Sequence, residues 1–163
     1  LRKKYPKVDI HQTALGEHPG KVEFFINTKK SGFSGMRQHG DSDGQIKLEV
    51  DCNRLDDLVP ADRKIGFMKI DAEGAERDDF RGMTRILSQS RPVILFECTR
   101  SGLDSFGYKA SEVYNFLVNE AGYQVYSFKN YLAGSDPLSL SDFEETMIYP
   151  FKAFNYIAAP KNS

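Results

Sequence analysis

The sequence of 163 residues contains no tryptophan, only two cysteines and no apolar run as long as a membrane span or the apolar part of a secretory signal. The two cysteines, Cys52 and Cys98, are too few for a disulfide framework or a cysteine metal cluster. A reducing compartment is therefore the simpler interpretation, and we predict a cytoplasmic protein.

The sequence also lacks an excess of charge of either sign. Lys and Arg total 22 and Asp and Glu total 23, which gives a formal net charge of -1. A protein that binds nucleic acid or an anionic membrane through its surface needs a basic face, which this composition does not provide. We therefore expect neither partner, while the composition leaves self-association into an oligomer open.

No internal repeat, low-complexity tract or linker divides the chain. Hydrophobic residues make up 40% and charged residues 28%, as in ordinary soluble domains, and the chain is long enough for one core. Because short apolar runs alternate with amphipathic segments, the sequence predicts one α/β domain over residues 1–163.

The centre of the chain is the stretch 65–76, where an apolar run ends at Asp71 and is followed by Ala-Glu-Gly-Ala-Glu. A helix is predicted from this turn to about Ser88, with three apolar side chains at helical spacing on one face. Those side chains are Phe80, Met83 and Leu87. A second apolar run, 93–96, then ends at Glu97.

A strand, a helix and a strand in succession predict two parallel, neighbouring strands joined by a right-handed crossover, in a mostly parallel sheet. In open sheets of this kind, ligands bind outside the carboxyl ends of the strands. Asp71 and Glu97 stand at those two ends, so the edge of the sheet that they share is the predicted site.

Apolar runs and turn residues predict five more strands, one more helix and four connections. The strands are expected over Val8–Leu15, Lys21–Asn27, Ile46–Cys52, Tyr123–Phe128 and Phe154–Ala159, and the helix over Ala110–Ala121. The connections are Thr28–Gly44, Asn53–Val59, Thr99–Gly107 and Asn130–Pro150. The first is polar and rich in glycine, which predicts a mobile segment that orders over bound ligand as a lid.

Residues 69–76, Lys-Ile-Asp-Ala-Glu-Gly-Ala-Glu, resemble the signature segment of the FkbM-type methyltransferases, which are S-adenosylmethionine-dependent enzymes with a class I, Rossmann-like fold. Segments on both sides agree in order with the same family, from about Val8 to Tyr123. They are Ala14-Leu15-Gly16, Leu55–Leu58, Arg81-Gly82-Met83, Pro92–Glu97 and Gly122-Tyr123. The resemblance implies a Rossmann-like sheet and S-adenosylmethionine as the cofactor.

The resemblance covers the later part of such an enzyme. Class I enzymes hold the cofactor with a glycine-rich turn after the first strand and an acid after the second, and this sequence shows neither segment. The chain thus resembles the C-terminal two-thirds of the domain, and we expect an N-terminally incomplete sheet that lacks its first strands and has an unpaired edge. We also expect the 163-residue chain by itself to bind S-adenosylmethionine weakly or not at all.

The resemblance also assigns site residues. It implies that Asp71 lies near the transferred methyl group and that Ala14 and Leu15 line the adenine, so these three are the predicted cofactor-binding residues. Asp71, Glu73 and Glu97 are the predicted catalytic residues.

Each carboxylate also has a purely structural interpretation. An acid after a strand can cap the next helix and complement its dipole, which applies to Asp71 and Glu73. Glu73 and Glu76 would share a helix face if both were helical, and Glu76 is expected to orient a neighbour or to meet solvent. Glu97 can simply pair with a Lys or Arg.

The predicted reaction is methyl transfer to a hydroxyl of a small molecule, because the acceptors of the family are often hydroxyl groups of sugars and natural products. An ordinary Asp, with a pKa of about 4, is a weak base for a hydroxyl proton, so burial of the carboxylate or a bound Mg²⁺ would have to assist. Asp71, Glu73 and Glu97 could supply oxygen ligands for such an ion, but no motif predicts a metal site.

Two other functions stay open. The first is a non-catalytic, methyltransferase-like binding domain, which the absence of the early cofactor segments favours. The second is a Mg²⁺-dependent phosphoacceptor or phosphatase-like α/β domain that uses Asp71, with Thr99 as a hydroxyl after the next strand but without a matching lysine.

Overall fold

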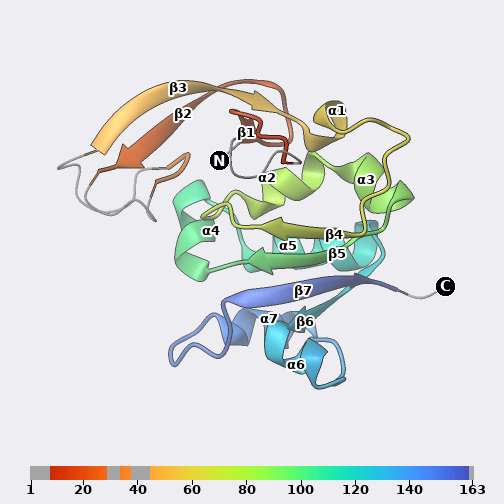
Figure 1. The fold of residues 1–163 in the computed structure, drawn as a ribbon. Coiled ribbons are helices and arrows are strands. Elements are labelled where there is room, and N and C mark those ends of the chain that lie inside the picture. Colours follow the sequence, from red (N-terminus) through yellow and green to blue (C-terminus); the bar gives the residue numbers. More distant parts are fainter. Residues whose placement is uncertain (1–7, 29–33, 38–44, 162–163) are drawn as a thin grey trace.

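The computed structural model describes residues 8–28, 34–37 and 45–161. Their strands form two sheets, with the strand orders β1-β3-β2 and β4-β5-β7-β6 (Figure 1). The first sheet holds β1 (Ala14–Leu15), β2 (Gly20–Asn27) and β3 (Gln45–Asn53). The second holds β4 (Phe67–Ile70), β5 (Val93–Glu97), β6 (Tyr123–Ser127) and β7 (Asn155–Pro160). The architecture is mixed α/β, as predicted.

The predicted strand–helix–strand unit is present in the second sheet. β4 and β5 are parallel neighbours, with Phe67 opposite Val93 and Ile70 opposite Phe96. β7 lies antiparallel between β5 and β6, so the sheet is mixed and the prediction of a mostly parallel sheet was wrong. The apolar run of β7 indicates a buried strand but carries no information on the direction of that strand. The direction depends on the end of the sheet at which the preceding loop places its first residue.

The crossover from β4 to β5 consists of two short helices, α2 (Glu76–Arg81) and α3 (Thr84–Gln89), rather than one long helix. The break falls at Gly82, where a Cβ atom would lie 2.2 Å from the carbonyl oxygen of Gly16. This backbone contact joins the crossover to the residue after β1. The predicted apolar face is confirmed, since Phe80, Met83 and Leu87 are all buried.

Four helices lie largely in segments predicted as connections. They are α1 (Leu55–Leu58), α4 (Arg100–Phe106), α6 (Phe128–Leu132) and α7 (Leu140–Thr146). The last three begin at Thr99, Ser127 and Ser139, whose hydroxyl oxygens each accept a hydrogen bond from the backbone N–H of the third helical residue. These start signals were present in the sequence, but the short segments show little apolar periodicity. Within the described ranges, no helix has the length and apolar content needed to cross a membrane.

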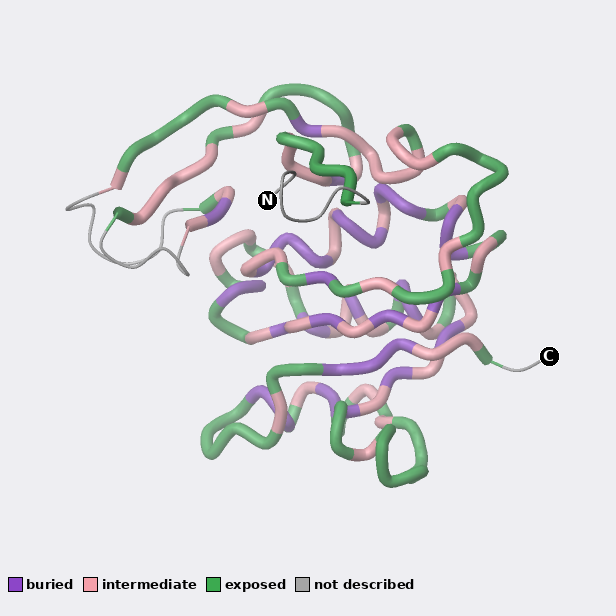
Figure 2. The backbone as a smooth tube through the Cα atoms, in the orientation of Figure 1, coloured by how far each residue is buried: buried purple, intermediate pink, exposed green. Residues whose placement is uncertain are grey.

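The helix predicted over 110–121 is present as α5 (Ala110–Asn115) followed by a π-helical turn, η2 (Phe116–Glu120). It packs with α2, α3, α7 and the four-stranded sheet in one apolar core, where most of the purple segments of Figure 2 lie. The rings of Phe80, Phe96, Tyr156 and Phe143 follow one another through this core with centroids 4.8–5.5 Å apart. The core therefore holds the ends of β4 and β5 in a rigid frame.

The three-stranded sheet departs most from the prediction. β1 covers only Ala14–Leu15, so the strand expected from Val8 was wrong over residues 8–13. The β2–β3 hairpin extends away from the core, and Ile46 and Leu48 are 50% and 42% exposed rather than half-buried (Figures 1 and 2). Alternating apolar residues become buried only where a second layer covers them, and no described element covers this end of the hairpin.

The predicted lid, Thr28–Gly44, is described only in part, since 29–33 and 38–44 lie outside the described residues. Gly35 and Phe25 exchange backbone hydrogen bonds of 2.8 and 3.0 Å, so this part of the segment is attached to β2. A Cβ atom on Gly35 would lie 3.7 Å from the Cβ of Glu73. The described part therefore contacts the turn after β4, and closure over a ligand stays a prediction.

Candidate functional site

The carboxyl ends of β4 and β5 bring Asp71 and Glu97 to the same edge of the sheet. Asp71 follows Ile70, which lies opposite Phe96, and Glu97 is the half-buried last residue of β5. Neighbouring strands in a sheet are about 4.8 Å apart, so the backbones that carry the two carboxylates are adjacent. This is the arrangement that the strand–helix–strand pattern predicted.

Asp71 forms an ion pair with Lys69, and its side chain is 43% exposed. It does not cap the next helix, because α2 has Ala75 as its N-cap and no side-chain hydrogen bond at that end. The interpretation of Asp71 as a helix cap was therefore wrong. An exposed carboxylate whose charge is balanced by a lysine can accept a hydrogen bond from a ligand at this edge.

The turn between β4 and α2 has an uncommon backbone. Glu73 has φ 52° and Gly74 has φ 109°, so Glu73 is not helical and does not share a helix face with Glu76. Gly74 lies against α4, where a Cβ atom on it would be 2.2 Å from the carbonyl oxygen of Gly102. The contact between the two glycine backbones determines the path of the chain after Asp71.

Glu76 is 1% exposed, which contradicts the expectation that it meets solvent. Its Oε1 atom accepts a 3.1 Å hydrogen bond from the backbone N–H of Gly74, and Oε2 has no partner among the described residues. Burial raises the pKa of Glu76 to about 7, although backbone N–H groups, that of Gly74 first, favour the charged form. Glu76 thus orients the turn after Asp71, which is the other role expected for it.

Sequence reasoning missed Asp79. This residue follows Glu76 by one helical turn and is 7% exposed, and no residue in the part of the chain that the structure describes donates a hydrogen bond to its side-chain carboxylate. Burial raises the pKa of Asp79 to about 7, and the charges of Glu76 and Asp78 add to the shift. The available signal was its spacing of four residues from Met83, which places both on the buried face of the crossover.

A cavity of about 410 Å³ adjoins Asp71. Its lining consists of Leu15, Leu55, Met68, Lys69, Ile70, Asp71, Ala72, Asp79 and Met83. It brings together Leu15 at the end of β1 and Asp71 at the end of β4, two of the three predicted cofactor residues. The third, Ala14, does not line it, and neither do Glu73 and Glu97.

Asp78 differs from its neighbour Asp79 in being fully partnered. Its carboxylate accepts a 2.9 Å hydrogen bond from Arg77 and a 2.7 Å hydrogen bond from the Tyr108 hydroxyl. The Arg77 guanidinium also lies 4.7 Å above the Tyr108 ring. These groups line a second cavity of about 410 Å³, which shares Leu15 with the first.

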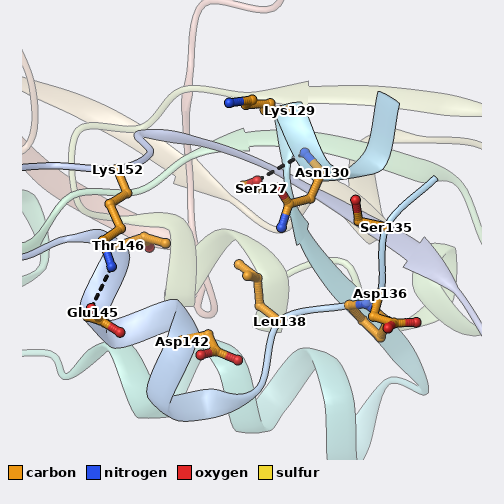
Figure 3. Close-up of a pocket in the computed structure, with 11 residues that line it drawn as sticks. Ser127, Lys129, Asn130, Ser135, Asp136, Leu138, Asp142, Glu145, Thr146 and Lys152 are labelled. Atoms are coloured by element: carbon orange, nitrogen blue, oxygen red, sulfur yellow. Dashed lines mark hydrogen bonds and ion pairs between the residues drawn. The ribbon is translucent and has the colours of Figure 1, made fainter. Parts of the chain in front are cut away.

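A further cavity, of about 570 Å³, lies at the carboxyl end of β6 (Figure 3). β5 and β6 are both antiparallel to β7 and so run in the same direction, which places this cavity at the same edge of the sheet as Glu97. Most of its lining is polar: Ser127, Lys129, Asn130, Ser135, Asp136, Pro137, Leu138, Asp142, Glu145, Thr146 and Lys152. Lys152 forms an ion pair with Glu145 at one side (Figure 3).

An exposed strip of aromatic rings begins beside Glu97. Tyr149, Phe151 and Phe154 are 82%, 54% and 44% exposed, with successive ring centroids 5.9 and 5.2 Å apart. The carbonyl oxygen of Phe154 accepts a 2.9 Å hydrogen bond from the backbone N–H of Cys98, which follows Glu97. The loop between α7 and β7 therefore presents aromatic surface next to a predicted catalytic residue.

The three predicted catalytic carboxylates do not converge as metal ligands. Across residues 8–28, 34–37 and 45–161, no group of three or more His, Cys, Asp and Glu side chains is placed to hold a metal ion. Asp71 and Glu97 end adjacent strands, while Glu73 belongs to the turn with positive φ values. Their suggested role as a joint set of oxygen ligands is not supported.

Strands that end in acids, with a cavity at their carboxyl ends, form the arrangement at which open α/β sheets bind their ligands. Residues 1–125 match the methyltransferase FkbM domain, and the chain belongs to the FkbM methyltransferase family. No curated protein and no solved structure matches the chain. The match confirms the resemblance seen in residues 69–76, and it ends before the segment that forms the cavity at β6.

Proposed function

We propose that the chain is an S-adenosylmethionine-dependent methyltransferase with a Rossmann-like fold that methylates a hydroxyl group on a sugar or another natural product. The observation that carries this proposal is the cavity shared by Leu15 and Asp71 in a chain of the FkbM family. Its apolar walls and the little-exposed carboxylate of Asp79, to which no described residue donates a hydrogen bond, fit a positively charged group attached to carbon chains. When bound there, S-adenosylmethionine supplies a methyl group activated by a positively charged sulfur.

The residues of the chain contribute mainly by positioning, because methyl transfer is an in-line displacement that requires an aligned acceptor oxygen. Asp71 accepts a hydrogen bond from the acceptor hydroxyl and orients its oxygen. Glu97, on the adjacent strand, provides a second carboxylate that can take the hydroxyl proton as the oxygen attacks. Glu76 and Gly74 hold the turn that carries Asp71 in place.

The acceptor binds, in this proposal, at the end of β6 and along the aromatic strip of Tyr149, Phe151 and Phe154. Sugar rings present C–H groups that pack on aromatic faces and hydroxyls that need both donors and acceptors. The strip offers the first kind of contact, and the cavity of Figure 3 offers the second through Asn130, Asp136 and their neighbours. Both features adjoin the edge of the sheet that carries Glu97.

A binding titration and a transfer assay together separate this proposal from the two alternatives. The methyltransferase binds S-adenosylhomocysteine and transfers labelled methyl groups, a non-catalytic relative binds without transfer, and a phosphatase-like domain does neither. The hydroxyl of Thr99, which that last function would use, accepts the Gly102 N–H as the cap of α4. Calorimetry must extend to millimolar ligand, because we expect the isolated chain to bind the cofactor weakly.

Replacing Asp71 with asparagine should lower kcat/KM for methyl transfer by about 100-fold or more, because the change keeps the shape and removes the charge that orients the hydroxyl. The half-exposed position predicts a melting temperature within about 2 °C of the wild type. Labelled transfer to a panel of sugars and natural-product hydroxyls measures the first effect, and circular dichroism the second.

The matched control for that variant is Asp57→Asn, which removes an exposed acid from α1. It should leave both quantities unchanged. Wild-type turnover by the Asp71→Asn protein would remove Asp71 from the proposed mechanism.

A further inference from the structure

The carboxylate of Asp79 is the most poorly compensated charge beside the candidate site. It is 7% exposed and lines the cavity that Asp71 also lines. No residue in the described ranges donates a hydrogen bond to it, and the nearby charges that act on it, those of Glu76 and Asp78, have its own sign. A carboxylate that is this little exposed is costly to ionise without an opposite charge, so a cation in the cavity beside it would stabilise its ionised form.

The other acids around Asp79 already have partners. Asp71 is paired with Lys69, and Asp78 binds Arg77 and Tyr108. Glu76, which does not line the cavity, accepts the N–H of Gly74 through Oε1, while its Oε2 has no partner among the described residues. The cavity therefore contains one balanced ion pair and one carboxyl group without an opposite charge beside it. A ligand that carries a single positive charge would complete it.

The walls of the cavity decide which kind of cation fits. Leu15, Leu55, Met68, Ile70 and Met83 supply its apolar lining. An ammonium group brings three N–H donors that each require an acceptor, and these walls offer few. A sulfonium carries its charge on a sulfur bonded to three carbons and has no donor to satisfy, so an apolar cavity with one carboxylate suits it better.

We propose that Asp79 is the counter-ion for a sulfonium group bound in this cavity. This inference rests on the proposed function, in which the sulfonium is that of S-adenosylmethionine. Asp79 then distinguishes the charged methyl donor from its product S-adenosylhomocysteine, which has the same shape apart from the methyl group but a neutral thioether sulfur. After transfer the cavity loses its cation, which favours release of the product.

In this proposal, binding of the sulfonium is coupled to release of a proton from Asp79. Because burial raises the pKa of Asp79 to about 7, a cation beside it favours the ionised form and displaces a proton at neutral pH. The groups that face Asp79 are Glu76 and Asp78 on its own helix, Lys69 from β4, Asp71 directly after β4, and the Cys52 thiol from β3. Burial also raises the pKa of the Cys52 thiol. Preference for the sulfonium should therefore increase as the pH rises through about 7.

The first test compares the two ligands by calorimetry at pH 6 and pH 8. At pH 8 the wild type should bind S-adenosylmethionine about 10-fold more tightly than S-adenosylhomocysteine, the ratio expected when the bound cation lowers the pKa of the carboxyl by about one. At pH 6 the preference should fall toward equality. Asp79→Asn should lose the preference at both values while its affinity for S-adenosylhomocysteine stays unchanged.

The control for the first test is Asp78→Asn, which removes a neighbouring charge of the same helix that faces Arg77 instead. It should keep a preference for the sulfonium at pH 8, although the loss of the Asp78 charge allows the pKa of Asp79 to fall and the preference to extend to lower pH. An Asp79→Asn protein that still prefers the sulfonium overturns the counter-ion role and leaves the methyltransferase proposal intact. Failure of the wild type to bind either ligand at concentrations up to millimolar overturns the assignment of this cavity to S-adenosylmethionine in the 163-residue chain.

A second test needs no cofactor. Trimethylsulfonium chloride is titrated into the wild-type chain while the carboxyl carbon of Asp79 is followed by nuclear magnetic resonance across the pH range. The cation should lower the pKa of Asp79, and sodium chloride at equal ionic strength should not. No difference between the two salts overturns the sulfonium site whatever the calorimetry shows. In the calorimetric test, Asp79→Asn can be compared directly with the wild type. The substitution removes a buried charge, so the variant is expected to fold at least as stably as the wild type.

Discussion

Replacing Gly74 with alanine should destabilise the folded chain by at least about 3 kcal/mol and lower the melting temperature by roughly 6–12 °C. The new Cβ atom would lie 2.2 Å from the carbonyl oxygen of Gly102 and 2.4 Å from its carbonyl carbon. Both are backbone atoms of α4, so the clash is relieved only if the turn or the helix moves. The φ of 109° at Gly74 adds strain that any side chain would feel. Thermal melting followed by circular dichroism measures the effect.

Alanine substitutions at two other glycines separate the destabilisation caused by a steric clash from that caused by an unfavourable φ angle. Gly107 has φ 75° but no atom within 4 Å of the position that a Cβ would occupy, so Gly107→Ala should cost only about 1 kcal/mol. Gly82 has an ordinary φ of -77° but would place its Cβ 2.2 Å from the Gly16 carbonyl oxygen, so its cost is purely steric. A Gly74→Ala protein no less stable than Gly107→Ala would show that β4 and α4 are not in contact through this turn.

The stability of the ligand-free chain should decrease as the pH rises from about 4 to about 7. Burial raises the pKa of both Glu76 and Asp79 to about 7, whereas in the unfolded chain they titrate near 4. Between these limits the folded state holds protons that the unfolded state has released, so each increase in pH favours unfolding. Below about pH 4 both states are protonated and above about pH 7 both are ionised, so this contribution becomes constant there. Denaturant unfolding at a series of pH values measures it.

Substitutions at Glu76 and Asp79 test whether these two buried carboxyl groups cause the pH dependence of stability. Glu76→Gln and Asp79→Asn should each flatten the profile in part and the double variant should flatten it further, because the two carboxylates interact and titrate as a coupled pair. Asp57→Asn, on the exposed side of α1, should leave the profile unchanged. A wild-type chain that becomes more stable between pH 5 and pH 7 would contradict the burial of these two acids.

Short-range patterns were sufficient for the central unit. The apolar runs that end at Asp71 and Glu97 and the spacing of Phe80, Met83 and Leu87 predicted parallel neighbours and a buried helix face, and both are present. The same patterns did not predict the break at Gly82, because it depends on contact with Gly16, which is distant in the sequence. They also did not predict the direction of β7 or the exposure of the β2–β3 hairpin, which depend on the neighbours of each strand.

The sequence by itself determined the family, the two strand-end carboxylates and their edge of the sheet, because these features depend on residues close together in the chain. Only the tertiary structure decided what surrounds them. It buried Glu76 and Asp79, paired Asp71 with Lys69, and joined Leu15 to Asp71 in one cavity. An acid in the first turns of a helix has the same sequence pattern whether it faces water or the core, so its pKa and its role follow from packing against β1 and β4, which no local pattern contains.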